Sequence, residues 1–320
     1  MTLSKLAKLA NVSVSTASKA FAGSREVNED TRNMIFNVAK QHGCFKKFYN
    51  AKYPKLVIAV IAPEFTSTYY AQFLSFIQQY LGARCELCVS ATEFSPVRES
   101  ALIEYYTKHT HADGIILIQS SADAPDTCET PVVFINPTHK QPHGVSIGCS
   151  MYPALNESVS YLVDRGVTSI GFIGEPLTAV KREWVRQSLA DHGIALDETY
   201  TSISDQRFEE GGYRAMQALF DADRVPRAVI CSYDNMAIGA VRCIRDHGLS
   251  VPDDVAVLGM DNIKQAPYLH PPLASISSNT EELCRLAAQA VLAQIYGESV
   301  PRQQEVKAQF CLRQSFEIRG

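Results

Sequence analysis

Short runs of apolar residues recur along most of the chain and alternate with segments of helical periodicity. The runs that read as buried strands are 56–62, 114–118, 131–135, 169–173, 228–232 and 254–260. Helical patterns lie between several of them, around 70–81, 97–108, 152–165, 180–192, 209–221 and 234–247. This alternation predicts parallel sheets with right-handed crossovers, covered by helices on both faces. Because the series breaks near 145–150, we expect two α/β lobes with a ligand cleft beyond the carboxyl ends of their strands.

The first 45 residues carry a different pattern, that of three short helices. Thr2, Ser13 and Asn28 each precede a helical segment and can cap it by accepting from its first backbone N–H groups. Asn11 tolerates the left-handed conformation that a tight turn between the first two helices needs. The pattern predicts a helix-turn-helix unit, whose second helix commonly enters the DNA major groove. The alternative left open is an ordinary helical cap on a larger domain.

Charge and the exposed face of the second helix both favour DNA binding. Residues 1–55 hold ten Lys and Arg against three acids, a net charge of +7, whereas the rest of the chain holds 20 basic and 31 acidic residues, a net charge of −11. Attraction to phosphate supplies most sequence-independent affinity for DNA, so a basic head on an acidic body suits this role. The second helix places the following side chains opposite its small apolar face: Val14, Ser15, Ser18 and Lys19.

Signatures of enzymes, metal sites and membrane proteins are missing from the sequence. No phosphate-binding loop, nucleophile elbow or paired zinc-ligand motif occurs, so we expect no enzyme activity, no cofactor and no metal. Cys85 and Cys88 lie three apart on an expected strand and would point to opposite faces, which argues against a redox or zinc pair. No apolar run is long enough to span a membrane, and no secretory signal opens the chain, so we expect a cytoplasmic protein without membrane contact.

Beyond these patterns, the chain resembles the LacI/GalR family of bacterial transcription regulators. The segments SKLAKLANVSVSTASKAFAG and VNEDTRNMIFNVAKQHG resemble the family's head, and ADGIILI, PVVFIN, SIGFIG, VAVLGMDN and HPPLASISSN resemble its body. The resemblance implies a DNA-docking head, a periplasmic-binding-protein-like body, a homodimer or higher oligomer, and a repressor controlled by a small ligand, expected to be a sugar or sugar derivative. The alternative is a cytoplasmic carbohydrate-binding or sugar-modifying protein without operator specificity.

The resemblance also assigns DNA contacts within the head. It places Val14, Ser15, Ser18 and Lys19 at bases or nearby phosphates. The backbone-contacting positions that it implies are hydroxyl or amide donors suited to phosphate oxygens: Thr16, Ser24, Asn28 and Thr31. Lys19 stands where the family usually has Arg, so the charge is kept while the bidentate fork that reads guanine is lost.

For the ligand, the resemblance implies a set of positions in the cleft: Tyr70, Asn136, Lys181, Tyr233, Asp234 and Asp261. A carboxylate at Asp261 can accept two hydroxyl hydrogen bonds, which suits a polyol or sugar; the alternative is an Asp that caps the next loop. For Asp234, at the start of a helix, a helix cap is as reasonable as a direct contact. Arg207 or Phe208 stands near the family's lid aromatic.

The expected domain division follows from these segments. It comprises a DNA-binding head at 1–45, a linker at 46–55, and a ligand-binding and dimerisation body at 56–320. In the body, the N-lobe takes about 56–148 and 278–305, and the C-lobe about 149–277 and 306–320. The linker CFKKFYNAKYPK has no clear counterpart of the family's hinge helix with its minor-groove Leu. We expect its lysines (Lys46, Lys47, Lys52 and Lys55) to attract phosphate, with Phe48 or Tyr49 as the alternative wedge.

Overall fold

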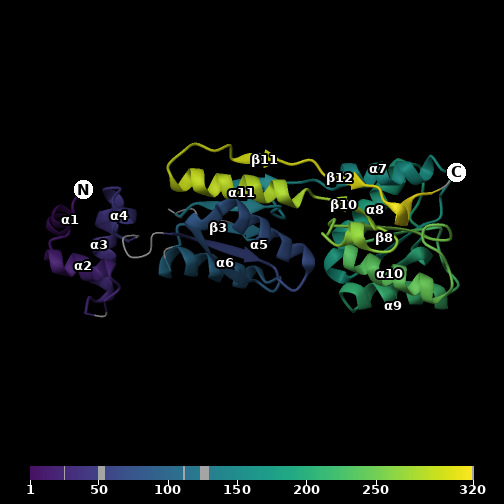
Figure 1. Ribbon diagram of the computed structural model, residues 1–320, viewed down its shortest axis with the longest axis horizontal. Helices are drawn as coiled ribbons and strands as arrows, with labels where there is room; N and C mark the ends of the chain where they lie inside the picture. The colour runs from purple at the N-terminus through teal and green to yellow at the C-terminus, as the bar shows by residue number, and fades with distance from the viewer. Residues whose placement is uncertain (25, 50–54, 111, 123–129, 319–320) are drawn as a thin grey trace. The chain divides into compact units, whose positions relative to one another are not determined.

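The computed structural model describes residues 1–24, 26–49, 55–110, 112–122 and 130–318. Its contacts divide the chain into two compact units, one of Met1–Ile58 with Leu81–Cys88 and one of Ala59–Tyr80 with Val89–Gly320. The helical head lies in the first unit and most of the two sheets in the second (Figure 1). The expected class, a helix-turn-helix head followed by two α/β lobes, is confirmed.

The head is built from short helices that begin at the expected capping residues. They are α1 (Leu3–Leu9), α2 (Val14–Phe21), α3 (Glu29–Gln41) and α4 (Phe45–Tyr49). The Ser13 hydroxyl accepts from the Thr16 N–H at 3.0 Å, and Asn28 Oδ1 accepts from the Thr31 N–H at 2.8 Å. Asn11 has φ 50°, which turns the chain between α1 and α2. Each cap satisfies a backbone donor that the helix itself leaves unpaired.

Helix α4 carries aromatic side chains that pack onto the head. The Phe36 ring meets Phe45 edge-on with centroids 5.0 Å apart, and Phe21 lies 5.6 Å from Phe48. Tyr49 packs on the same core. Helix α4 thus packs partly buried rings on the head, although most of its residues fall in the expected linker at 46–55.

Most of the rest of the expected linker lies outside the described residues. Residues 50–54, which include Lys52, are not described, and neither is the side chain of Lys46. Lys47 Nζ donates to the Met1 carbonyl at 3.0 Å, and Lys55 pairs with Glu86. These lysines thus already have partners within the protein, while Phe48 packs on the head core. The expected phosphate attraction by the linker stays a prediction.

In its described residues, the N-lobe is a sheet accompanied by helices α5, α6 and α11. Its strand order is β11-β5-β4-β3-β1-β2, with β3, β4, β5 and β11 paired in parallel. The strands are β1 (Leu56–Ala62), β2 (Cys85–Ala91), β3 (Gly114–Ile118), β4 (Val132–Ile135), β5 (Val145–Gly148) and β11 (Gln303–Glu305). The helices are α5 (Thr68–Leu81), α6 (Pro96–Glu104), which continues as a π-helical turn Tyr105–His109, and α11 (Thr280–Ile295). Helix α11 lies along β3, β4 and β5 (Figure 1).

The C-lobe repeats this architecture with the order β12-β10-β9-β8-β6-β7, in which only β12 is antiparallel. Its strands are β6 (Ile170–Gly174), β7 (Thr201–Ile203), β8 (Ala228–Cys231), β9 (Ala256–Met260), β10 (Ala274–Ser277) and β12 (Gln309–Cys311). Its helices are α7 (Tyr152–Val163), α8 (Ala179–Asp191), α9 (Phe208–Asp221) and α10 (Asp234–Asp246). The chain passes between the two sheets after β5, after β10 and after β11.

Glycines bring α9 and α10 into close contact. A Cβ added to Gly212 would lie 1.9 Å from the Met236 carbonyl oxygen, and one added to Gly239 would lie 1.9 Å from that of Glu209. Only glycine allows the two backbones to approach this closely. The packing fixes the starts of both helices, where Arg207 and Tyr233 are placed.

Candidate functional site

The second helix of the head presents a continuous exposed face. Val14 is 47% exposed although it is apolar, whereas Ala17 and Ala20 on the opposite face are buried. Ser15, Ser18 and Lys19, which the resemblance assigns to DNA, are all exposed as well. The fully buried side chains of the helix are thus small, Phe21 at its end is partly buried, and the exposed face is narrow enough to enter a groove.

The other DNA-contact candidates take part in local hydrogen bonds of the head. Thr16 and Ser13 hydroxyls are 2.8 Å apart, and the Ser24 hydroxyl accepts from the Glu26 N–H at 3.3 Å. Asn28 and Thr31 form the cap of α3 described above. These side chains flank the turns beside α2, so they hold the helix in place, and their role toward phosphate stays a prediction.

Lys19 is held by an acidic neighbour. Its Nζ lies 2.5 Å from Oε2 of Glu26, and both side chains are well exposed, at 46% and 70%. Bound DNA would compete with this carboxylate for the ammonium group, since both offer oxygen acceptors. We therefore predict that Glu26 opposes DNA binding at α2.

Replacing Glu26 with Gln should raise the affinity for DNA of any sequence, by up to about fivefold, the range typical of an exposed ion pair. Lys19→Ala should lower affinity for the preferred DNA sequence instead. Titrations of labelled duplexes at several salt concentrations would measure both effects. A matched control is Glu93→Gln, which breaks the exposed Arg98–Glu93 pair of the N-lobe. Equal affinities of Glu26→Gln and wild type would contradict the competition.

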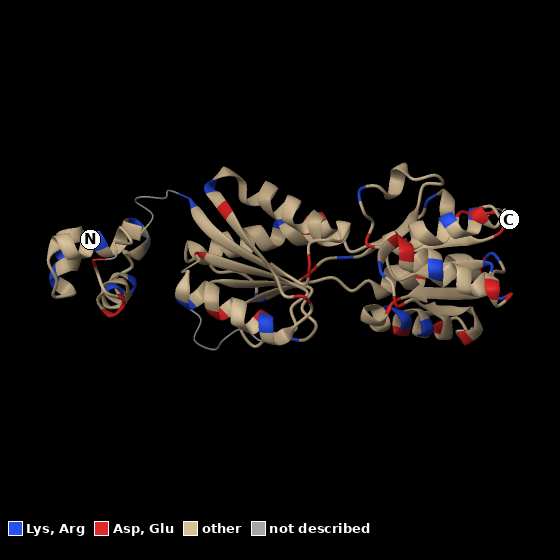
Figure 2. Cartoon of the chain, turned by 90° about the horizontal axis from the view of Figure 1, so that it is seen from below, with Lys and Arg blue, Asp and Glu red and all other residues tan. Residues whose placement is uncertain are grey.

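In the second unit, a pocket of about 940 Å³ lies between the two lobes. Its lining includes Tyr70, Asn136, Lys181, Tyr233 and Asp261, which the resemblance had assigned to the ligand. Inner strands of both sheets are nearly free of charge, while acidic and basic residues occur on the segments between the sheets (Figure 2). The pocket therefore concentrates polar groups at the ends of apolar strands.

Several polar side chains of the pocket follow strand ends in left-handed backbone conformations. Gln119 after β3 has φ 53°, Asn136 after β4 has φ 48°, and Asp261 after β9 has φ 108°. Non-glycine residues adopt such conformations at an energetic cost, and they cluster at binding sites. Asn136 Oδ1 accepts from the Cys149 N–H at 2.7 Å, and the Tyr70 hydroxyl pairs with Gln119. The N-lobe wall is thus fixed before any ligand arrives.

On the C-lobe wall, Lys181 and Asp261 form a partly buried pair. Lys181 Nζ lies 3.2 Å from Asp261 Oδ1 and donates to the Ser232 carbonyl at 2.7 Å. The side chains are only 18% and 9% exposed. Burial raises the pKa of Asp261, and the Lys181 ammonium opposes that rise. The pair presents an acceptor and a donor side by side, which suits a ligand with adjacent hydroxyl groups.

Asp234 lies outside the pocket lining, unlike the other predicted residues. It starts α10 but is fully buried, and its carboxylate accepts from Ser275 Oγ at 2.6 Å and from the Ile263 N–H at 2.8 Å. A Cβ on Gly259 would lie 2.1 Å from its Oδ1. Burial, followed by the nearby Asp261 charge, raises the pKa of Asp234 to about 8. Asp234 therefore braces the strand end that carries Asp261 instead of lining the pocket.

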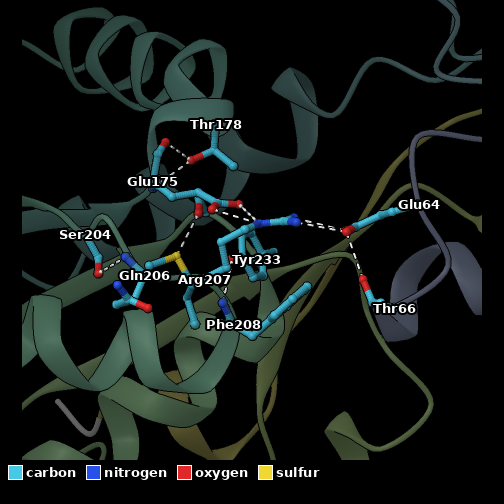
Figure 3. Close-up of polar contacts among 11 residues, drawn as sticks. Glu64, Thr66, Glu175, Thr178, Ser204, Gln206, Arg207, Phe208 and Tyr233 are labelled. Carbon is cyan, nitrogen blue, oxygen red and sulfur yellow. Dashed lines mark hydrogen bonds and ion pairs between the residues drawn. The ribbon is translucent and has the colours of Figure 1, made fainter. Parts of the chain in front are cut away.

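Arg207 forms a charged bridge between the lobes with Glu64 and Glu175, two residues that sequence reasoning missed (Figure 3). Arg207 donates through Nη1 and Nη2 to both oxygens of Glu64, at 2.8 and 3.0 Å. Its Nε donates to both oxygens of Glu175, at 3.2 and 3.0 Å. The sequence analysis named Arg207 or Phe208 as the position near the family's lid aromatic. It did not predict Glu64 or Glu175, because each is far from Arg207 in the sequence and no local pattern links them. The only tryptophan of the chain, Trp184, also lines the pocket.

Two negative findings apply to the described part of the chain. No helix there is long and apolar enough to cross a membrane. Within the same residues, no group of three or more His, Cys, Asp or Glu side chains is arranged to hold a metal ion.

Comparison with known proteins covers both units. Residues 2–44 match the sequence model of bacterial regulatory proteins of the lacI family, and residues 159–316 match that of a periplasmic binding protein-like domain. The HTH-type transcriptional repressor CytR of Escherichia coli K12 is 28% identical over 313 residues, covering 93% of this chain and 91% of the relative. The probable HTH-type transcriptional repressor ExuR of Bacillus subtilis 168 is 29% identical, covering 92% of each.

Solved structures agree with the fold. A complex of the transcriptional regulator CelR with cellobiose superposes with a TM-score of 0.69 at 25% identity, covering 98% of this chain and 99% of the other. The lac repressor dimer bound to operator and the anti-inducer ONPF gives 0.69 at 21% identity, covering 99% of each. Together with the matches to the head and the body, these findings confirm the resemblance drawn from the sequence. The chain is thus similar to the lacI family of bacterial regulatory proteins in its head and to periplasmic binding protein-like domains in its body.

Proposed function

We propose that this protein is a repressor that binds operator DNA as a homodimer, and that a small ligand of the sugar class in the interlobe pocket changes its affinity for that DNA. The observation that carries the proposal is the presence, on one chain, of an exposed α2 face and a pocket of about 940 Å³ lined by aromatic and polar side chains. In this proposal the head reads DNA, and the body from residue 56 binds the ligand and dimerises.

The mechanism that we propose is a shift between open and closed arrangements of the lobes. The pocket takes walls from both lobes, so a ligand that contacts both would favour the closed arrangement. In a homodimer, two copies of α2 read two half-sites whose spacing must match the spacing of the heads. A change in the lobes that alters this spacing would change operator affinity without a contact between ligand and DNA.

The test begins with DNA. Selection of bound duplexes from a random library by the full-length protein should return an inverted repeat, as two-fold symmetry requires. Operator titrations with and without glucose, cellobiose, ribose or uridine should then find a ligand that changes affinity about tenfold, and Asp261→Asn should reduce that change. Binding without sequence preference would contradict the proposal and favour a carbohydrate-binding protein of another kind.

A further inference from the structure

The cation that bridges the lobes is shared by two carboxylates. The Arg207 guanidinium donates through both Nη atoms to Glu64, which is bound bidentately, and its single Nε–H is shared between the two oxygens of Glu175 (Figure 3). The Glu64 side chain is 13% exposed and that of Glu175 is 3% exposed. Thr66 also donates to Glu64, at 2.9 Å. The positive charge of Arg207 is therefore more than balanced where it meets the pocket.

The second partly buried cation, Lys181, is balanced as well. Lys181 is paired with Asp261 and bonded to a backbone carbonyl. The remaining Lys of the lining, Lys140, is exposed at the edge, and Glu305 lies on the same pocket. Counted with Glu175, the charged groups of the pocket carry no excess of positive charge. Among the described residues of the lining, an anionic ligand would find each partly buried Lys or Arg already paired with a carboxylate.

This arrangement discriminates between classes of ligand. A carboxylate or phosphate on a ligand would come close to Glu64, Glu175 or Asp261 in a partly desolvated site, where like charges repel strongly. Uncharged hydroxyl groups face no such repulsion, because they can donate to the remaining lone pairs of the carboxylates and accept from Lys181. Aromatic side chains of Tyr70 and Trp184 supply apolar surface for the faces of a ring.

We infer that the pocket selects an uncharged polyhydroxylated ligand, and that Glu64 and Glu175 exclude sugar acids and sugar phosphates by occupying Arg207. The inference rests on the proposed function, because it assumes that this pocket holds the ligand. It goes further by naming the charge of the ligand and the residues that set it. Both are specificity-determining residues that act through Arg207.

The experiment compares probes that differ only in charge, on the full-length protein. The pairs are glucose with glucuronate, ribose with ribose 5-phosphate and uridine with uridine 5′-monophosphate, and inorganic sulfate serves as the smallest anion. Fluorescence of Trp184, the single tryptophan, reports occupancy of the pocket directly. In the wild-type protein, every anionic probe should bind at least about tenfold more weakly than any neutral partner that binds.

Variants then test the assigned residues. Glu64→Gln and, independently, Glu175→Gln should each raise affinity for glucuronate or sulfate by about tenfold or more, since one carboxylate is lost from Arg207. The matched control is Glu210→Gln, which breaks the exposed Arg214–Glu210 pair of α9 and should change nothing. Thermal unfolding confirms that each variant is folded.

The outcomes separate the inference from the proposed function. An anionic probe that binds the wild-type pocket as tightly as its neutral partner overturns the inference, as does a folded pair of variants that gain no affinity for sulfate or glucuronate. Neither result contradicts the proposed function, which is tested by measuring the effect of ligand on operator affinity. Conversely, Trp184 fluorescence could show that neutral probes bind more tightly than anionic ones while no neutral probe changes operator affinity. That result would support the selectivity of the pocket and contradict its regulatory role.

Discussion

A Lys181→Met variant should lose about 2 kcal/mol of unfolding free energy at neutral pH, together with the effect of ligand on DNA binding. Methionine keeps most of the length of the side chain but leaves Asp261 without its cation, and Asp261 is only 7% exposed. The loss stays below the range for fully buried pairs because the Lys181 side chain is 18% exposed toward a pocket that admits water. Urea unfolding gives the stability, and operator titration gives the ligand effect.

The double variant Lys181→Met with Asp261→Asn separates charge from packing. If the cost comes from an uncompensated carboxylate, the second change should restore most of the stability but none of the ligand response. The deficit of the single variant should also shrink as the pH falls, since a protonated Asp261 needs no cation. An equal deficit in the single and the double variant would show that Lys181 acts through packing alone.

The stability of the C-lobe should fall as the pH rises from about 4 to about 8, and Asp234→Asn should flatten this dependence. The carboxyl of Asp234 has its pKa raised to about 8 by burial. In the unfolded chain it ionises near pH 4, so between these values the native state binds more protons than the unfolded state. Unfolding free energy must then decrease with rising pH, by as much as about 5 kcal/mol over the whole window.

Asparagine is isosteric and stays neutral, so at pH 8 the variant should be more stable relative to wild type than it is at pH 5. Urea unfolding followed by Trp184 fluorescence across this range measures the difference. The exposed Asp221, changed to Asn, is the control and should keep the wild-type slope. A wild-type slope in Asp234→Asn would show that the buried carboxyl is ionised throughout, held by Ser275 and Ile263.

Much of the fold can be predicted from the sequence because its helices and strands depend on local chemistry. The expected strand at 56–62 coincides with β1, and the expected helix at 209–221 is α9 within one residue. The head is predicted well since Ser13 and Asn28 are strong capping residues. Helix α11 was not predicted. Its N-cap residue, Asn279, has a left-handed backbone conformation and its side chain makes no capping hydrogen bond, so the capping signal is absent. The edge strands β7, β11 and β12 are only three residues long, too short for alternation to show.

The site is less legible because its chemistry joins distant segments. Asp261 and Asn136 can be predicted as site residues, since each follows an apolar strand and ligands bind at the carboxyl ends of strands in α/β sheets. The bridge of Arg207 to Glu64 joins residues 143 apart, and nothing local to either residue signals the other. Asp234 shows the opposite failure. Its motif suggested a ligand contact or a helix cap, yet its partner Ser275 lies 41 residues away and buries it.

The three passages of the chain between the sheets have a consequence during synthesis on the ribosome. The N-lobe begins at β1 but needs α11 and β11, whose residues 280–305 emerge only after nearly all of the C-lobe. A nascent chain thus carries an unfinished N-lobe, whose apolar β3 and β4 lack the covering helix α11, for most of its translation. Exposed apolar strands of this kind attract chaperones and aggregate when release is premature. Prematurely terminated chains that retain the head should therefore be cleared rather than accumulate as unregulated DNA-binding fragments.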